Sequence, residues 1–188
     1  MARRSKKNNN TVFLFCIFLF IVIVFIFLTK NDNIGKDQYA DKKLEYIETT
    51  KPLANKIAKK YKLFPSVILA QSALESNYGS SELSSTYNNY FGIKSNSKDG
   101  VRLDTIEYVN NKGGVYNENF RSYRSKIDSF VDYAKLITRA KRYEKVRQAN
   151  DYKEACKSLQ ECGYATDPNY ADKIISIIEK YKLYELDF

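Results

Sequence analysis

The stretch FPSVILAQSALE at residues 64–75 carries the clearest structural signal in the sequence. It is almost free of charge, and Pro65 stands where the first turn of a helix tolerates proline. The tetrapeptide SNYG follows, and its glycine, Gly79, is a residue type that commonly stops a helix. We therefore predict a strongly apolar helix that begins near Pro65 and carries Glu75 at its end.

Glu75 is the first candidate for chemistry, because it ends this apolar helix on the same face as Ser72 and Gln71. A carboxyl group pressed against apolar surface has a raised pKa, and such a group can act as a general acid. The alternative is a solvated glutamate at a helix end. A negative charge at a helix C-terminus is mildly unfavourable, which favours a functional reason for this residue.

Hydrophobic spacing predicts further helices on both sides of this one. The segments 39–50 and 52–61 precede it, and Pro52 is expected to open the second of them. For the last helix we expect Asp167 as the N-cap and Pro168 as the first helical residue. The helices expected downstream lie around 127–137, 151–161 and 170–181.

Between residues 87 and 120, short runs rich in Tyr, Phe, Val and Ile alternate with Gly, Asn and Lys, which is typical of strands and turns. Two glutamates of this region, Glu107 and Glu118, could each supply the second carboxylate of a carboxylate pair, and composition does not choose between them. The expected fold is α+β and mainly helical, with a small β-hairpin lobe inserted between the helices. The strands are expected at 91–94, 105–109 and 115–120, with a turn at 110–114.

The absence of histidine from 188 residues excludes His-dependent triads and His-liganded zinc or haem. Three cysteines are too few for a four-thiolate metal site, and the carboxylates do not cluster at ligand spacing, so we expect no metal and no cofactor. The net charge is +9, but the first ten residues hold much of it. The remainder is only mildly basic, and we expect no nucleic-acid partner.

Cys156 and Cys162 stand six positions apart. One unbroken helix would hold their Cα atoms about 9 Å apart, too far for a disulfide. A helix that ends near Gln160 would permit a bridge. Two small buried side chains are the alternative, and we prefer it slightly.

Residues 12–28 form an uninterrupted apolar run, VFLFCIFLFIVIVFIFL. As a helix it would be roughly 25 Å long, near the short end for a bilayer span. A cleaved signal peptide is the alternative, but the run is long for one and no small-residue cleavage site follows it. We predict an uncleaved transmembrane anchor at 11–29.

The flanks of this anchor predict its orientation. Residues 1–10 are purely basic and are expected to form a cytoplasmic tail, because the basic flank stays inside. Residues 30–44 are expected to be a linker and the start of the first helix, and residues 45–188 a single domain. The expected location is the cell membrane, with one span and the domain on the cell-wall side.

Four motifs occur in an order that resembles the bacterial peptidoglycan β-N-acetylglucosaminidases of glycoside hydrolase family 73. They are FPSVILAQSALES at 64–76, NNYFGIK at 88–94, FRSY at 120–123 and GYATDP at 163–168. The resemblance covers about residues 45–185. It implies a lysozyme-like helical lobe with a small β-lobe, and cleavage of glycan strands on the reducing side of N-acetylglucosamine.

The resemblance also implies roles for particular residues. Glu75 matches the general acid of the family, Glu107 in TIEY matches a second functional glutamate and is favoured over Glu118, and Tyr164 matches a tyrosine that lines the cleft. Relatives commonly carry Trp where this sequence has Tyr78, which can still stack on a sugar. The expected substrate-binding residues are Gln71, Tyr78, Tyr87, Asn89 and Phe91.

Several alternatives stay open at this point. The second carboxylate could position a water for inversion, or the N-acetyl group of the substrate could assist. A lysozyme-like muramidase or lytic transglycosylase would use Glu75 alone, and a non-catalytic cell-wall-binding assembly module would use neither. The expected partners are peptidoglycan strands and the membrane through residues 11–29, with the chain acting as a monomer.

Overall fold

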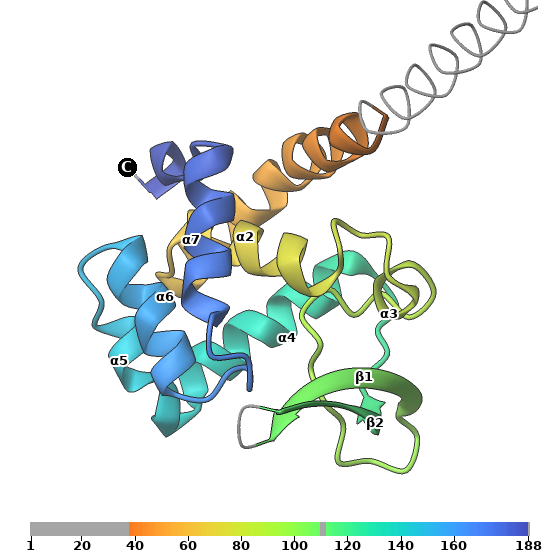
Figure 1. Cartoon of the computed structure of the whole chain (residues 1–188). Helices are drawn as coiled ribbons and strands as arrows, with labels where there is room; N and C mark the ends of the chain where they lie inside the picture. The colour runs from red at the N-terminus through yellow and green to blue at the C-terminus, as the bar shows by residue number, and fades with distance from the viewer. Residues whose placement is uncertain (1–37, 110–111, 188) are drawn as a thin grey trace, which may run out of the picture. The chain divides into compact units, whose positions relative to one another are not determined.

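The structure is a computed structural model that describes residues 38–109 and 112–187 (Figure 1). Backbone contacts divide the chain into residues 1–43 and 44–188, and the architecture below is that of the second unit. Residues 38–61 are helical. The elements that follow are α2 (Pro65–Glu75), α3 (Glu82–Ser85), β1 (Val101–Val109), β2 (Lys112–Phe120), α4 (Lys126–Arg139), η1 (Lys141–Tyr143), α5 (Glu144–Arg147), α6 (Tyr152–Glu161), α7 (Tyr170–Lys180) and η2 (Leu183–Asp187).

Helix α2 is the centre of the helical lobe, as its composition predicts. Every residue from Ser66 to Ala73 is buried, and the helix packs against α6, α7 and η2. Pro65 is its first residue. At the other end the chain turns away through left-handed backbone at Asn77, Tyr78 and Gly79, which confirms the predicted stop and leaves Glu75 in the last turn.

The helix before α2 differs from the prediction, because it does not restart at Pro52. Residues 38–61 run as one helix through the proline. The physical reason is packing: the buried side chains on either side of Pro52 form one continuous stripe, and burying that stripe outweighs the backbone hydrogen bond that proline removes. The stripe consists of Tyr46, Ile47, Thr50, Ala54, Ile57 and Ala58.

The hairpin forms a small lobe beside the helices (Figure 1), and its strands are longer than predicted. Gly113 and Gly114 were expected in the turn, but they lie in β2 and pair with Tyr108 and Glu107. The predicted turn residues 110–111 lie outside the described part of the chain.

The segment Phe91–Lys94 was expected to be a strand and is not one. Its contribution to the sheet is a single bridge from Lys94 to Phe120. The reason is local: the side chain of Asn89 accepts the N–H groups of Phe91 and Ile93, and Gly92 has φ +62°, which no strand allows.

The three downstream helices are confirmed as α4, α6 and α7, with one correction. Helix α7 begins at Tyr170 with Asn169 as its N-cap, so Asp167 and Pro168 precede the helix. Asp167 instead accepts from the backbone N–H of Asn169 and pairs with Lys173. The thiols of Cys156 and Cys162 are unbridged, and Cys162 caps the end of α6.

The predicted tail at 1–10, the anchor at 11–29 and residues 30–37 of the linker lie outside the described residues. Within residues 38–109 and 112–187, no helix has the length and apolarity that a membrane crossing requires.

Candidate active site

A cleft of about 740 Å³ runs past the end of α2. Its wall combines Glu75 with the segment after α3, with Thr105 of β1, and with the loop that leads into α7. The helical lobe and the hairpin lobe thus contribute to the same cleft. Arg142, from the 3-10 turn η1, extends the wall on the helical side.

Glu75 lies half-buried in this cleft with its two carboxyl oxygens in different surroundings. The hydroxyl of Tyr170 donates to Oε1 at 2.6 Å. Oε2 lies beside Gly92, where a β-carbon would come within 3.4 Å of it. Gly92 therefore serves two needs, since it adopts φ +62° and leaves room for the carboxyl group.

A buried chain of hydrogen bonds holds Tyr170 in this orientation. The Nε2 of Gln71 donates to the Tyr170 hydroxyl oxygen at 2.9 Å, and the Tyr133 hydroxyl donates to Oε1 of Gln71. The Tyr170 oxygen accepts a hydrogen bond from Gln71, so the phenolic proton of Tyr170 is free to point at Glu75. Burial, followed by the charge of Glu75, raises the pKa of Tyr170 well above its ordinary value, so the hydroxyl remains a donor.

The arrangement corrects one predicted role. Gln71 was expected to bind substrate, but its side chain is completely buried on the core face of α2. An amide at that position needs partners inside the protein, and two tyrosines supply them. Gln71 acts on the cleft through Tyr170.

Tyr164 stands on the cleft wall, stacked on Tyr170 with the ring centroids 5.7 Å apart. Its hydroxyl donates to the backbone carbonyl of Phe91 at 3.0 Å, which ties the loop before α7 to the segment around Gly92. Burial, and then the charge of Glu75, raises the pKa of this hydroxyl well above its ordinary value. The tyrosine is thus a neutral group close to the carboxyl group of Glu75.

The other residues expected to bind substrate have mixed outcomes. Asn89 is completely buried and fastens the backbone of Phe91, Ile93 and Arg121. Phe91 borders the cleft, but its ring is 1% exposed and stacks on Tyr133 at 4.1 Å. Both side chains are buried in the interior, so these residues support the backbone of the cleft wall and do not present their side chains to a substrate.

Tyr78 and Tyr87 lie elsewhere. The ring of Tyr78 meets the edges of Tyr46 and Tyr181, and it does not border the cleft. Tyr87 accepts the backbone N–H of Tyr123 through its carbonyl oxygen. The structure therefore does not bring these two tyrosines together with Glu75.

The two glutamates of the hairpin are distinguished by their neighbours. Glu118 forms an ion pair with Lys94 at 3.3 Å. The backbone of Glu107 pairs with that of Gly114 in the ladder. Position 107 is two residues along β1 from Thr105, which borders the cleft, and positions two apart in a strand lie on one face.

Tyr170 was not predicted as a site residue, because its helical spacing indicated a position in the core. Its contact with Glu75 joins residues 95 positions apart, and no local pattern reports such a contact. The charged groups on the cleft wall were not predicted as site residues either, although three of them lie within the quoted motifs. These groups are Lys94, Arg121, Arg142, Asp167 and Lys173.

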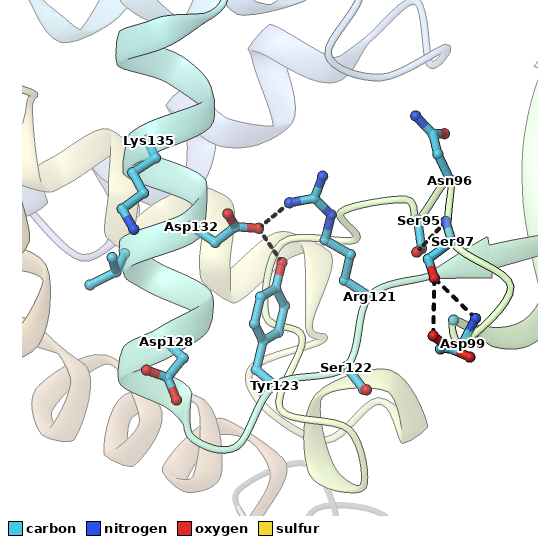
Figure 2. Close-up of a pocket in the computed structure, with 12 residues that line it drawn as sticks. Ser95, Asn96, Ser97, Asp99, Arg121, Ser122, Tyr123, Asp128, Asp132 and Lys135 are labelled. Carbon is cyan, nitrogen blue, oxygen red and sulfur yellow. Dashed lines mark hydrogen bonds and ion pairs between the residues drawn. The ribbon is translucent and has the colours of Figure 1, made fainter.

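A second cavity of about 670 Å³ adjoins the cleft, and Figure 2 shows its lining. One wall is the face of α4 that carries Asp128, Val131, Asp132 and Lys135. The loop before β1 and the segment after β2 form the other walls. Across the cavity, Arg121 and the hydroxyl of Tyr123 both reach Oδ2 of Asp132 at 2.7 Å.

Comparison with known proteins shows that the chain is similar to glucosaminidases and peptidoglycan hydrolases. The family described as Mannosyl-glycoprotein endo-beta-N-acetylglucosaminidase matches residues 51–183. Exo-glucosaminidase LytG of Bacillus subtilis is 38% identical over 100% of this chain and 70% of its own length. Peptidoglycan hydrolase FlgJ of Vibrio parahaemolyticus is 35% identical over 72% of this chain, which spans 46% of that relative.

A solved structure is similar as well. The catalytic domain of the autolysin Auto from Listeria monocytogenes aligns with 78% of this chain and 88% of its own, at 38% identity and a TM-score of 0.65. The mainly helical α+β architecture with a two-stranded sheet is therefore shared with a cell-wall autolysin domain.

Proposed function

The chain belongs to the glucosaminidase family of peptidoglycan hydrolases, and from this premise we propose that it cleaves the β-1,4 bond on the reducing side of N-acetylglucosamine with Glu75 as the general acid. The observation that carries this proposal is the position of Glu75. It is half-buried at the wall of a cleft that both lobes build, and a buried tyrosine orients it.

The geometry supports a definite place for the transferred proton. Oε1 of Glu75 accepts the hydrogen bond from Tyr170, so the proton is best carried on Oε2. Gly92 carries no side chain beside that oxygen, and a β-carbon there would be in van der Waals contact with it at 3.4 Å. In the proposed step Oε2 gives its proton to the glycosidic oxygen as the bond to the sugar breaks.

Glu107 is the proposed second carboxylate. Its position on β1 shares a face with Thr105 of the cleft wall. Glu118, which pairs with Leu103, lies on that face as well, but it is engaged in an ion pair with Lys94. Glu107 would act as the base for an attacking water in an inverting reaction. If the substrate's N-acetyl group attacks instead, Glu107 would orient that group.

Tyr164 is proposed to support the reaction as a neutral wall of the cleft. Its hydroxyl donates to the carbonyl oxygen of Phe91. Because the pKa of this hydroxyl is raised, Tyr164 stays neutral beside Glu75. The ring of Tyr164 stacks on the ring of Tyr170 and so helps to hold the Tyr170 hydroxyl near Glu75.

The proposed location follows from the sequence. The apolar run within residues 11–29 and the basic residues before it favour a membrane-anchored monomer, with the hydrolase domain on the cell-wall side. Peptidoglycan would meet the domain there.

The experiment that tests the proposed bond is mass spectrometry of purified peptidoglycan after digestion. We expect new reducing ends that carry N-acetylglucosamine. Ends that carry muramic acid would indicate a muramidase, and anhydro-sugar ends would indicate a lytic transglycosylase. No new ends from a folded protein would contradict hydrolysis by this chain.

A second candidate concerns the mode of attack. The relative from Bacillus subtilis is named an exo-glucosaminidase, whereas the family description is that of an endo-enzyme. Our proposal is endo-cleavage, which is the mode that the family description names. Release of single N-acetylglucosamine units from strand ends in the same digest would favour the exo mode.

A further inference from the structure

The second cavity is joined to the cleft of Glu75. Asn96 and Arg121 border both of them, so a substrate that fills the cleft can send a branch past these two residues. Figure 2 shows Arg121 directed at Asp132 of α4, with Asn96 on the loop beyond it. The cavity is therefore placed beside the path of the substrate.

The chemistry of this cavity differs from that of a sugar site. Aromatic faces commonly hold apolar ring surfaces, but among its described lining residues Tyr123 is the one aromatic, and its hydroxyl is bound to Asp132. Charged groups dominate instead. Acidic and basic side chains both occur, so the cavity suits a ligand that carries charges of both signs.

Some of these groups have unused bonding capacity within the described part of the chain. The half-buried ammonium of Lys135 forms no ion pair or hydrogen bond there, and neither does the amide of Asn96. Asp132 accepts both of its bonds on Oδ2, which leaves Oδ1 open. A ligand in the cavity could therefore accept hydrogen bonds from Lys135 and Asn96 and donate one to Oδ1 of Asp132.

The opposite charges on α4 have a fixed spacing. Asp128 and Lys135 are seven residues apart on one face of the helix, which places them about 10 Å apart along its axis. A bound molecule that bridges them needs a carboxylate at one end and an amine at the other. A short peptide with a free carboxylate and a diamino acid meets that requirement.

We propose that this cavity binds the peptide stem of peptidoglycan, with Lys135 holding a stem carboxylate and Asp128 holding the amine of its diamino acid. The proposal rests on the proposed function, since peptidoglycan strands carry such peptides on alternate sugars. A sugar in the cleft would direct its stem past Arg121 into the cavity. The enzyme would then prefer strands that retain their stems.

The test compares two substrates: strands with their stems, and strands from which an amidase has removed them. The quantity measured is the ratio of kcat/KM on the first to kcat/KM on the second. Lys135→Met should lower that ratio roughly tenfold, because a charge-assisted hydrogen bond is lost. The matched control is Lys157→Met, which removes the same charge from an exposed position on α6 away from both cavities.

A second arm tests the amine. Asp128→Asn should lower the ratio on natural strands, and it should have no further effect on strands whose stem amine has been acetylated. The peptide L-Ala-γ-D-Glu-L-Lys should inhibit cleavage by the wild-type protein, and Lys135→Met should weaken that inhibition. These outcomes together support a stem site.

Two results would overturn the proposal. One is an unchanged ratio in Lys135→Met, and the other is an equal loss on both substrates, which would mean that the residue acts on the glycan or on folding. Failure of the proposed function would look different, because the wild-type protein would then release no new N-acetylglucosamine ends from either substrate.

Discussion

The hydroxyl of Tyr170 lies 2.6 Å from Oε1 of Glu75, so the start of α7 holds the carboxyl group at the end of α2. Gln71, one turn before Glu75 on α2, donates to the same hydroxyl. Gln71 and Glu75 of α2 therefore both form hydrogen bonds with the hydroxyl of Tyr170 on α7. The pair Tyr170 and Gln71 thus holds Oε1 of Glu75 in place.

Replacing Glu75 by Gln should abolish most of the activity and keep the fold. The amide oxygen can still accept from Tyr170, but no proton is available for the leaving oxygen. We expect the rate on peptidoglycan to fall by roughly 100-fold or more. Reducing-end release measures the rate, and a urea unfolding midpoint close to that of the wild type shows that the fold is intact. Wild-type turnover would remove Glu75 from its role.

Tyr170→Phe should change the pH dependence of the reaction. A hydroxyl that donates to a carboxylate stabilises its ionised form, so its loss favours the protonated acid. The alkaline limb of the kcat/KM profile should move upward by about one pH unit. The variant should also lose about 1–3 kcal/mol of stability, because Nε2 of Gln71 is left without its acceptor.

The control for this variant is Tyr133→Phe. It removes the hydrogen bond at the other end of Gln71 and leaves the Tyr170 bond to Glu75 in place. It should destabilise the protein with little movement of the alkaline limb. If both variants give the wild-type profile, Tyr170 does not tune the acid.

Gly92→Ala should lower activity more than stability. The methyl group would lie 3.4 Å from Oε2 of Glu75, and the positive φ adds about 1–2 kcal/mol of strain. Gly163→Ala is the matched variant, since Gly163 has φ +67° and a β-carbon there meets no atom within 4 Å. Both should unfold at similarly reduced urea concentrations. An equal loss of activity would show that strain alone is responsible.

Glu107→Gln and Glu118→Gln separate the two carboxylates of the hairpin. We expect the first to lower turnover strongly, because Glu107 is the proposed second carboxylate. The second should have a much smaller effect, since it only breaks an ion pair with Lys94 at the surface. The opposite order of effects would exchange their roles. Full activity in both would favour a mechanism with Glu75 alone.

Much of this fold could be predicted from the sequence. The periodicity of α4 and α7 and the apolar run of α2 report burial directly, and the structure has these helices within a few residues of their expected positions. Pro52 misled because the backbone hydrogen bond that it removes costs less free energy than the burial of one continuous helix face provides. Gly113 and Gly114 misled because glycine is typical of turns, whereas both residues pair across the ladder with Tyr108 and Glu107.

The site could be predicted less completely. Glu75 and Tyr164 could be singled out because their motifs are local in the sequence, and both border the cleft; their roles in the reaction stay predictions. The roles of Gln71 and Tyr170 were not, because each depends on hydrogen bonds between helices that only the tertiary structure brings together. A buried amide in an apolar helix was the one available signal, and it indicates an internal partner rather than a substrate contact.

Lys126 should make the protein more stable as the pH rises above neutrality, an effect that a neutral residue at this position would not have. Its ammonium lies over the rings of Tyr46, Tyr90 and Phe130 and donates to Oγ1 of Thr50 at 2.6 Å. Burial lowers the pKa of this group to about 8, from an ordinary value of 10.5. Between these two pH values the unfolded chain keeps a proton that the folded chain has released. The contribution of Lys126 to the free energy of unfolding therefore rises with pH across that window.

The comparison that isolates this effect is the wild type against Lys126→Met, with urea unfolding measured near pH 7 and near pH 9.5. The stability of the wild type relative to the variant should increase at the higher pH, because the cost of a buried charge is relieved only when Lys126 is present. Tyrosines such as Tyr46, whose pKa burial raises to about 12, are common to both proteins and largely cancel in the difference. A difference that stays constant, or that shrinks as the pH rises, would mean that the folded protein holds Lys126 charged through this range.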